Sequence, residues 1–322
     1  MVKNCTNIQD VSDITAHVYV CGYSPEGESV LFFLYDEKQK YVLYSILIDS
    51  YFFYTNRLFK IFDKYDIENQ KLDMIVWTHP HQDHSRGFES IIDKYCNKKT
   101  IYHIPSDMLR YKIDGEKLCK DAEKSYTKIK SLKNGAVFPI KNVVGKSTEI
   151  INCEYEDKNK RNFSFSVKIL TPHSNFLFNE LEEKSSVNGN AFSISLLIKV
   201  GQMNFLFGGD TENDAWKCVP KDDLKYIDFV KIPHHGSDSA SDIIKLVTNR
   251  KTKALGACTS YEKGKKHLPQ SNILNQYGSI CDSIYLTRGN NGQKTYGLVE
   301  YVFKISEMSV YEPNLFGDAV KF

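Results

Sequence analysis

The chain has 322 residues, of which 41% are hydrophobic, and a formal net charge of +2. This length can form one large domain or two small ones, with a substantial core. The near-neutral charge excludes the global basic field of a dedicated nucleic-acid binder. The eight cysteines form no CxxC pair, which argues against a structural zinc ribbon and a disulfide scaffold.

The N-terminal region carries Lys3, Asp10 and Asp13 and has no long apolar run, so it does not look like a signal peptide. No segment approaches the roughly 18 consecutive apolar residues that a membrane-spanning helix needs. We therefore expect reduced thiols, a cytoplasmic location and no membrane partner.

The first half of the chain alternates strand-like and helix-like segments. Runs rich in Val, Tyr, Phe and Ile predict strands at 16–22, 29–35 and 41–48. Apolar residues at helical spacing predict helices at 55–65 and 87–95, and a short buried strand, Met74 to Trp77, lies between them. The lysine-rich stretch 106–160 follows and contains an amphipathic pattern over 116–132 that predicts a further helix.

The second half repeats this alternation. We expect strands at 163–170, 192–200, 204–207, 229–233, 254–259, 279–287 and 296–305. Helices are expected at 211–218 and 239–248, and a turn at 289–292, whereas 311–322 fits no element. We predict a single domain over 1–322 in which about 106–160 is an insertion.

A group of metal-binding residue types directly follows the strand Met74 to Trp77. His79 and His81 alternate with Pro80, so an extended backbone directs both imidazoles toward one ion, while Asp83 and His84 lie past the turn and can serve a second. Imidazole and carboxylate suit zinc, manganese or iron. The pattern therefore predicts a site for two adjacent metal ions.

The run from Thr78 to His84 resembles the THxHxDH motif of the metallo-β-lactamase fold superfamily. The resemblance implies an α/β fold, a four-layer αββα sandwich of the metallo-β-lactamase type. In that family an Asp at a strand end orients the metal loop without binding metal, and Asp49 fits this position. The family's bridging carboxylate ends a hydrophobic strand, as Asp210 does after Phe205 to Gly209.

Adjacent histidines in His234, His235, Gly236, Ser237 follow another strand and resemble the HHGS form of the branch that includes the nuclease-like domain of the DNA-uptake protein ComEC. Neighbouring side chains on an extended chain face opposite ways, so one histidine binds metal and the other contacts substrate or packs. We favour His234 as the ligand and His235 as the substrate-facing or outer residue, although the reverse assignment stays open.

Five further residues match the branch less closely. His173 or Thr171 falls where the superfamily supplies the third imidazole of its first metal site, and we favour His173. Asn190 or Ser193 resembles a polar element that lines the site, and either can instead be an ordinary loop residue. His267 resembles a late His-Pro element that can donate a hydrogen bond to a leaving oxygen, or it is a surface histidine.

The resemblance implies a dinuclear metal-dependent hydrolase with two divalent ions, zinc in preference to manganese, and a metal-bridging hydroxide as nucleophile. Its metal ligands would be His79, His81, Asp83, His84, His173, Asp210 and His234, with Asp83, His235 and His267 as catalytic candidates. The branch favours a phosphodiesterase or nuclease acting on a nucleic acid or nucleotide. Hydrolysis of a lactone, thioester or β-lactam is the alternative within enzymes, and a metal-binding effector or interaction module acting with a partner is the alternative from another class.

Overall fold

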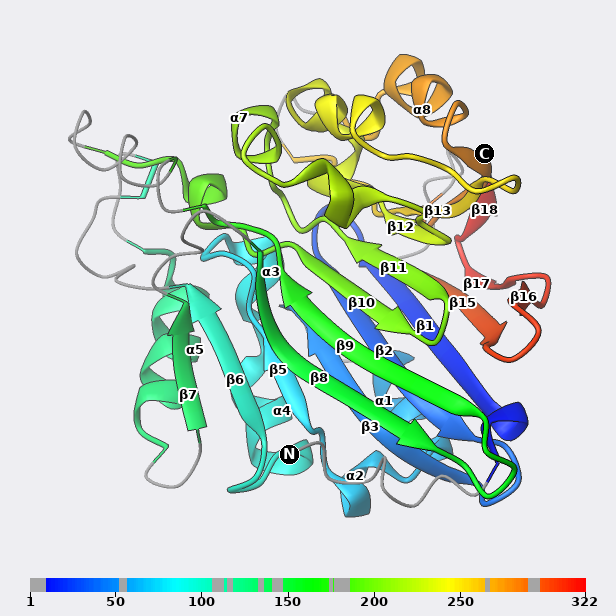
Figure 1. Cartoon of the computed structure of the whole chain (residues 1–322). Coiled ribbons are helices and arrows are strands. Elements are labelled where there is room, and N and C mark those ends of the chain that lie inside the picture. The colour runs from blue at the N-terminus through cyan, green and yellow to red at the C-terminus, as the bar shows by residue number, and fades with distance from the viewer. Residues whose placement is uncertain are drawn as a thin grey trace.

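Three long strands rich in β-branched and aromatic residues begin the fold: β1 (Ile14–Tyr23), β2 (Glu28–Asp36) and β3 (Tyr41–Ile48). They pair antiparallel in sequence order because short turns connect them. The computed structural model in Figure 1 describes residues 10–51, 57–105, 113–114, 118–132, 136–140, 147–173, 176, 186–263, 267–288 and 296–322.

The first sheet extends from these strands in both directions. On one side, β5 (Met74–Val76), β6 (Ile101–Pro105) and β7 (Ala136–Ile140) add parallel to β3 in that order. On the other side, β15 (Tyr296–Lys304) pairs antiparallel with β1 and carries β16 (Ser309–Val310) and β17 (Asn314–Gly317). The two-residue β4 (Ser50–Tyr51) follows β3.

The second sheet also mixes parallel and antiparallel pairs. Its antiparallel part contains β8 (Thr148–Glu156), β9 (Asn162–Ile169), β10 (Leu196–Val200) and β11 (Met203–Phe207). Its parallel part adds β12 (Phe229–Lys231), β13 (Ala254–Cys258) and β14 (Cys281–Leu286), and β18 (Val320–Lys321) closes the edge. The stretch 106–160 thus supplies the last strand of each sheet, β7 and β8.

The two sheets lie face to face, and helices cover their outer faces (Figure 1). Phe32 of the first sheet meets Phe205 of the second with ring centroids 5.5 Å apart, and both are fully buried. Fully burying a side chain of this size contributes about 1.5–3 kcal/mol. The inner layer between the sheets is therefore the principal hydrophobic core.

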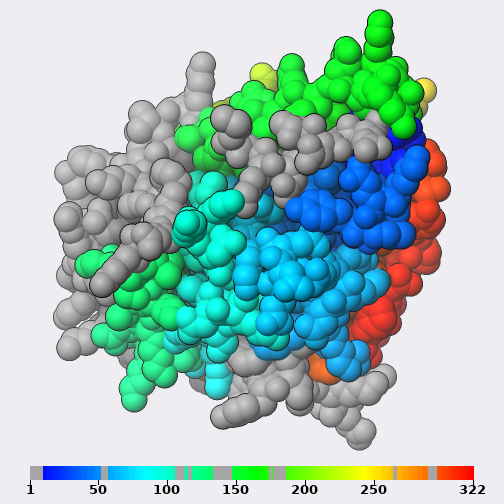
Figure 2. Space-filling model, turned by 90° about the horizontal axis from the view of Figure 1, so that it is seen from below, coloured from blue at the N-terminus to red at the C-terminus, as the bar shows by residue number. Residues whose placement is uncertain are grey.

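Helices α1 (Arg57–Lys64), α4 (Phe88–Tyr95) and α5 (Lys120–Lys130) bury apolar stripes against the first sheet, near the short α2 (Ile67–Gln70). Figure 2 shows this end of the molecule, where blue to cyan residues of the N-terminal half occupy the middle of the face. The second sheet is covered by α7 (Asn213–Trp216), α8 (Ser271–Tyr277) and a 3-10 segment, η7 (Asp238–Lys245).

The structure confirms an α/β fold with two mixed sheets, and most expected elements are present. Three differ. The strand expected from 192 begins only at Leu196, because residues 189–192 form the 3-10 turn η4 (Gly189–Phe192). The helix expected at 239–248 is the 3-10 segment η7. The unassigned C-terminal residues form β17 and β18.

The turn expected at 289–292 lies outside the described residues. None of the described helices is long and apolar enough to cross a membrane.

Candidate metal centre

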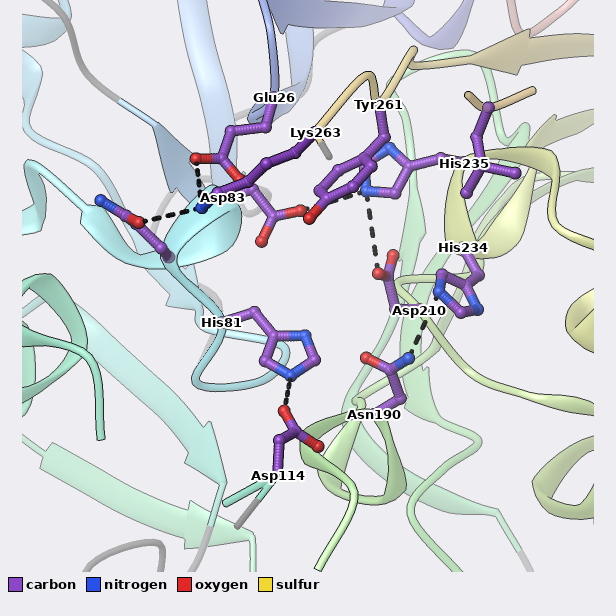
Figure 3. Close-up of a pocket in the computed structure, with 12 residues that line it drawn as sticks. Glu26, His81, Asp83, Asp114, Asn190, Asp210, His234, His235, Tyr261 and Lys263 are labelled. Carbon is purple, nitrogen blue, oxygen red and sulfur yellow. Dashed lines mark hydrogen bonds and ion pairs between the residues drawn. The ribbon is translucent and has the colours of Figure 1, made fainter. Parts of the chain in front are cut away.

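Polar side chains gather where the loops after β5, β11, β12 and β13 meet. The carboxyl ends of neighbouring parallel strands lie at one edge of a sheet, so residues distant in sequence converge there. A cavity of about 280 Å³ opens at this edge, and Figure 3 shows the residues around it. Those that line it are Glu26, His81, Gln82, Asp83, Asp114, Asn190, Asp210, His234, His235, Tyr261, Lys263 and Leu268.

One group of potential donors contains His79, His81 and Asp210. His79 Nε2 lies 3.0 Å from His81 Nδ1 and 3.8 Å from Asp210 Oδ2. All three side chains are delivered by loops at strand ends, His79 and His81 after β5 and Asp210 after β11. The two ring nitrogens therefore point toward a common position beside the carboxylate.

A second group of potential donors, Glu28, His84, Asp210 and His235, shares Asp210 with the first, and Asp83 lies against its two imidazoles. His84 Nε2 is 3.5 Å from Asp83 Oδ2 and 3.5 Å from Asp210 Oδ1. His235 Nε2 is 3.3 Å from Asp83 Oδ2 and 3.7 Å from Asp210 Oδ2. These separations are too long for hydrogen bonds. They are close to the roughly 2.9–3.6 Å between neighbouring donors that each lie about 2.0–2.2 Å from one ion.

Three atoms of this second group, His84 Nε2, Asp210 Oδ1 and His235 Nε2, are buried and have no hydrogen-bond partner. Leaving buried polar atoms unpaired costs about 1–3 kcal/mol each. A divalent cation between them would satisfy all three at once. The donor set and its spacing therefore fit a metal ion.

The hydrogen bonds behind the rings decide which nitrogen of His79 and His84 faces the site. Asp49 accepts hydrogen bonds from the Thr78 N–H (2.7 Å) and the Thr78 hydroxyl (2.6 Å). Because that hydroxyl donates to Asp49, its oxygen accepts from His79 Nδ1 at 2.9 Å. His84 Nδ1 donates to Asp49 as well, at 2.7 Å. Each ring thus keeps the lone pair of Nε2 for the site.

The other two rings are oriented in the same way. His81 Nε2 donates to Asp114 Oδ2 at 2.6 Å, which leaves Nδ1 facing the site. His235 Nδ1 lies 3.0 Å from the Thr259 hydroxyl, and that hydroxyl donates to Glu28 at 2.5 Å. His235 must then donate to Thr259, so Nε2 carries its lone pair toward Asp83. In all four rings the hydrogen bond behind the ring thus fixes which nitrogen faces the site, as outer partners of metal-binding histidines do.

A close approach of the backbone fixes His81 further. A Cβ added at Gly189 would lie 2.3 Å from His81 Nε2, so only glycine fits against this ring. The Gly189 N–H also donates to Asp114 Oδ1 at 3.1 Å. One turn thus holds both the imidazole and the carboxylate behind it.

Burial and charge shift the titration of the cluster strongly. Burial would lower the pKa of His84, but the carboxylates around it, Asp210 first, raise it well above its ordinary value. Burial would raise the pKa of Asp210, yet His84 and His235 hold it well below its usual range. The pKa of Asp83 is lowered by the same two imidazoles against the opposing effect of burial. The carboxylates are therefore ionised and rely on positive charge nearby.

The pKa values of His79 and His81 shift in opposite directions. Burial, together with His84 and His81, lowers the pKa of His79 well below its ordinary value. Burial alone would also lower the pKa of His81, but its hydrogen bond to Asp114 and the nearby carboxylates raise it. Burial raises the pKa of Asp49, and His84 opposes this rise.

The contacts of His234 and His235 are the reverse of the assignment favoured from the sequence. His235, not the favoured His234, lies against Asp83 and Asp210. Both residues have positive φ, +46° and +51°, so the chain is not extended here and turns His234 away. His234 Nδ1 lies 2.9 Å from the Ser239 hydroxyl, and its Nε2 lies 3.3 Å from Asn190 Nδ2 (Figure 3). His234 lines the cavity, where it can meet a ligand.

Two other candidate histidines lie outside both donor groups. His173 is buried, and its Nδ1 has no hydrogen-bond partner among the described residues, but it belongs to neither group. His267 is exposed and does not line the cavity, although its neighbour Leu268 does. Thr171 hydrogen-bonds to the backbone oxygen of Ser193, so it braces the loop. Ser193 in turn accepts a hydrogen bond from the Asp210 N–H at 2.8 Å.

The sequence reasoning missed Glu28 and Lys231. These two residues form a fully buried ion pair directly behind His84 and His235. Burial would raise the pKa of Glu28, but Lys231 and the two imidazoles lower it. The signal in the sequence was Lys231 itself, because a lysine inside an apolar strand must have a buried partner.

Neither a family model nor a curated protein matches this chain. The function proposed below is therefore inferred from the geometry of the site and from the sequence motifs.

The contacts of Asp49 make a testable prediction. In Asp49→Asn, the new amide group would face donors from Thr78 and His84. We expect the affinity for zinc to fall about 10- to 100-fold, as when other outer partners of metal-binding histidines are lost. Competition with a chromophoric chelator measures this, and Asp36→Asn, which changes a turn-capping carboxylate at the end of β2, is the matched control. Equal affinities for the two variants would contradict the role of Asp49.

Proposed function

We propose that this protein is a dinuclear metal-dependent hydrolase of the metallo-β-lactamase fold type that cleaves phosphodiesters. One observation carries the proposal. Four imidazoles each turn one nitrogen toward Asp83 and Asp210, while their other nitrogens are all held by hydrogen-bond partners, so a metal ion that displaces any proton there would find four lone pairs. The face-to-face sheets with helices on both outer sides are consistent with the four-layer sandwich that the sequence motifs imply.

His79, His81 and Asp210 would hold one ion. Asp83, His84, His235 and Asp210 would hold the second, with Glu28 behind the two imidazoles. Zinc and manganese both suit this set of imidazoles and carboxylates. When bound, the two ions would supply Lewis-acid stabilisation of developing negative charge and would lower the pKa of a water molecule.

The chain's own residues would then bind and orient the substrate. Lys263 places a positive charge at the edge of the cavity, where its amine lies 3.0 Å from Glu26 and 3.4 Å from Gln82. His234 and Tyr261 add polar groups to the lining (Figure 3). Glu26 compensates much of this charge, because the two residues form an ion pair. The preference for a phosphodiester over a neutral ester or lactone therefore comes from the resemblance of His234 to Ser237 to the HHGS branch.

The proposal is tested by hydrolysis of bis(p-nitrophenyl) phosphate. The purified protein is stripped with a chelator, reloaded with zinc or manganese, and its bound metal is counted before the assay. We expect turnover only in the reloaded protein. DNA, RNA and cyclic nucleotides would then be compared as substrates. No turnover by protein shown to hold two ions would overturn the proposal, and lactones, thioesters and a partner-dependent role would be tested next.

A further inference from the structure

The two donor groups are unequal. The second contains two carboxylates and two imidazoles, whereas the first contains only His79, His81 and Asp210 among the described residues. The sequence motifs place a third imidazole in the first group, but His173 is not part of it. Another buried donor on the cavity wall near His81 and Asp210 would complete the first group.

Asn190 lines the same cavity and is 7% exposed. Its side-chain oxygen is buried and has no hydrogen-bond partner within the part of the chain that the structure describes. In Figure 3 this oxygen lies on the side of His81, and the amide nitrogen lies on the side of His234. The unpaired acceptor thus faces the part of the cavity that the first donor group borders.

The orientation of this amide is fixed by its neighbours. Asn190 Nδ2 donates to Glu212 Oε1 at 3.2 Å, and an ionised carboxylate can only accept. The nitrogen must therefore face Glu212, and the oxygen must face the other way. The Asn190 N–H also donates to Asn188 Oδ1 at 3.0 Å, which fixes the backbone from which the side chain projects.

The same turn positions His81. Gly189 packs against the His81 ring and binds Asp114 behind it, and Asn190 is the next residue. A buried carbonyl oxygen without a partner is unfavourable, and amide oxygens are ordinary ligands of divalent cations. We propose that the side-chain oxygen of Asn190 is a further protein donor to the first metal site, in the place of a third imidazole.

This inference rests on the proposed two-metal site and specifies its composition. A neutral amide oxygen is a harder and weaker donor than imidazole. The first site would then hold its ion less tightly than a site with three imidazoles, and manganese would compete with zinc better there than at the second site. Glu212 acts through Asn190 and is a positioning residue.

The test counts metal ions in Asn190→Ala. We expect the wild-type protein to bind two zinc ions, and the variant to bind one ion with unchanged affinity and the other at least about 10-fold more weakly. Competition with a chromophoric chelator gives both affinities. The unfolding temperature in excess chelator should not fall, because the substitution removes an unpaired buried group.

Asn69→Ala is the matched control. Asn69 is an exposed asparagine of α2 whose amide donates to Asp66 at 2.7 Å, so metal binding should stay at the wild-type level. If Asn190→Ala does not fold, Glu212→Gln replaces it as the test, because a glutamine at 212 lets the Asn190 amide turn over and should weaken the same ion.

Unchanged binding of both ions in Asn190→Ala would overturn the inference. So would an equal weakening of both ions together with a lower unfolding temperature, which would show that Asn190 has a structural role only. Metal binding is measured here without any assay of hydrolysis. A protein that binds two ions through Asn190 and hydrolyses no phosphodiester would support this inference and contradict the proposed activity.

Discussion

Asp210→Asn is expected to remove most of the metal-dependent hydrolysis of bis(p-nitrophenyl) phosphate. The carboxylate presents Oδ1 to His84 and Oδ2 to His79 and His235, so both of its oxygens face donor groups. An asparagine would replace one oxygen with an amide group that cannot bind a cation. Losing an outer partner of a metal-binding histidine typically costs about 10- to 100-fold in metal affinity or activity. Asp210 faces the site directly, so we expect turnover to fall by more than about 100-fold.

The control for this prediction is Asp214→Asn. Asp214 is an exposed residue of α7 that pairs with Lys217 at 2.7 Å, four residues from Asp210 in sequence. Its substitution should leave turnover unchanged. Metal analysis of both variants, with unfolding followed in excess chelator, separates loss of the ions from loss of the fold. Full activity of Asp210→Asn with two bound ions would show that Asp210 does not bridge the two groups.

Local sequence patterns were sufficient for the strands and for the loop after β5. The run Met74 to Trp77 is wholly apolar and buried, and the polar residues that follow can only lie at the sheet edge. Asp49 could be placed for the same reason, and its contacts with Thr78 and His84 agree with the orienting role that the resemblance implied. Such features depend on a few neighbouring residues.

The order of His234 and His235 could not be predicted, because the argument assumed an extended chain. Both residues adopt a left-handed conformation that side chains other than glycine rarely take, and this reverses which ring enters the cluster. The strand expected from 192 was assigned on its apolar content, whereas Asn188 caps a 3-10 turn there. Tertiary contacts decided both outcomes.

Glu28 and Lys231 are 203 residues apart in sequence, so no local pattern joins them. Lys231 lies within the expected strand 229–233, whereas Glu28 directly precedes the expected strand 29–35. Only the pairing of the two sheets places Glu28, at the start of β2, beside Lys231, at the end of β12. The structure therefore adds a charged pair behind His84 and His235 that the motifs do not contain.

Lys231→Met should destabilise the metal-free protein by about 3–5 kcal/mol, since removing one partner leaves Glu28 buried and uncompensated. The pKa values agree in direction. Burial would lower the pKa of Lys231, but Glu28 first and then Asp210 raise it, so the amine is charged in the folded state. Urea unfolding in excess chelator at constant pH measures the loss of stability.

The double variant Glu28→Gln, Lys231→Met separates the effect of the ion pair on stability from its effect on metal affinity. Replacing both partners of a buried pair with neutral residues of similar size is often close to neutral, so the double variant should recover most of the stability that Lys231→Met loses. It should not recover metal affinity, because Glu28 holds the Thr259 hydroxyl that orients His235. Recovery of both properties would mean that the pair serves the fold alone, whereas recovery of stability without metal affinity would place Glu28 in the support of the metal centre.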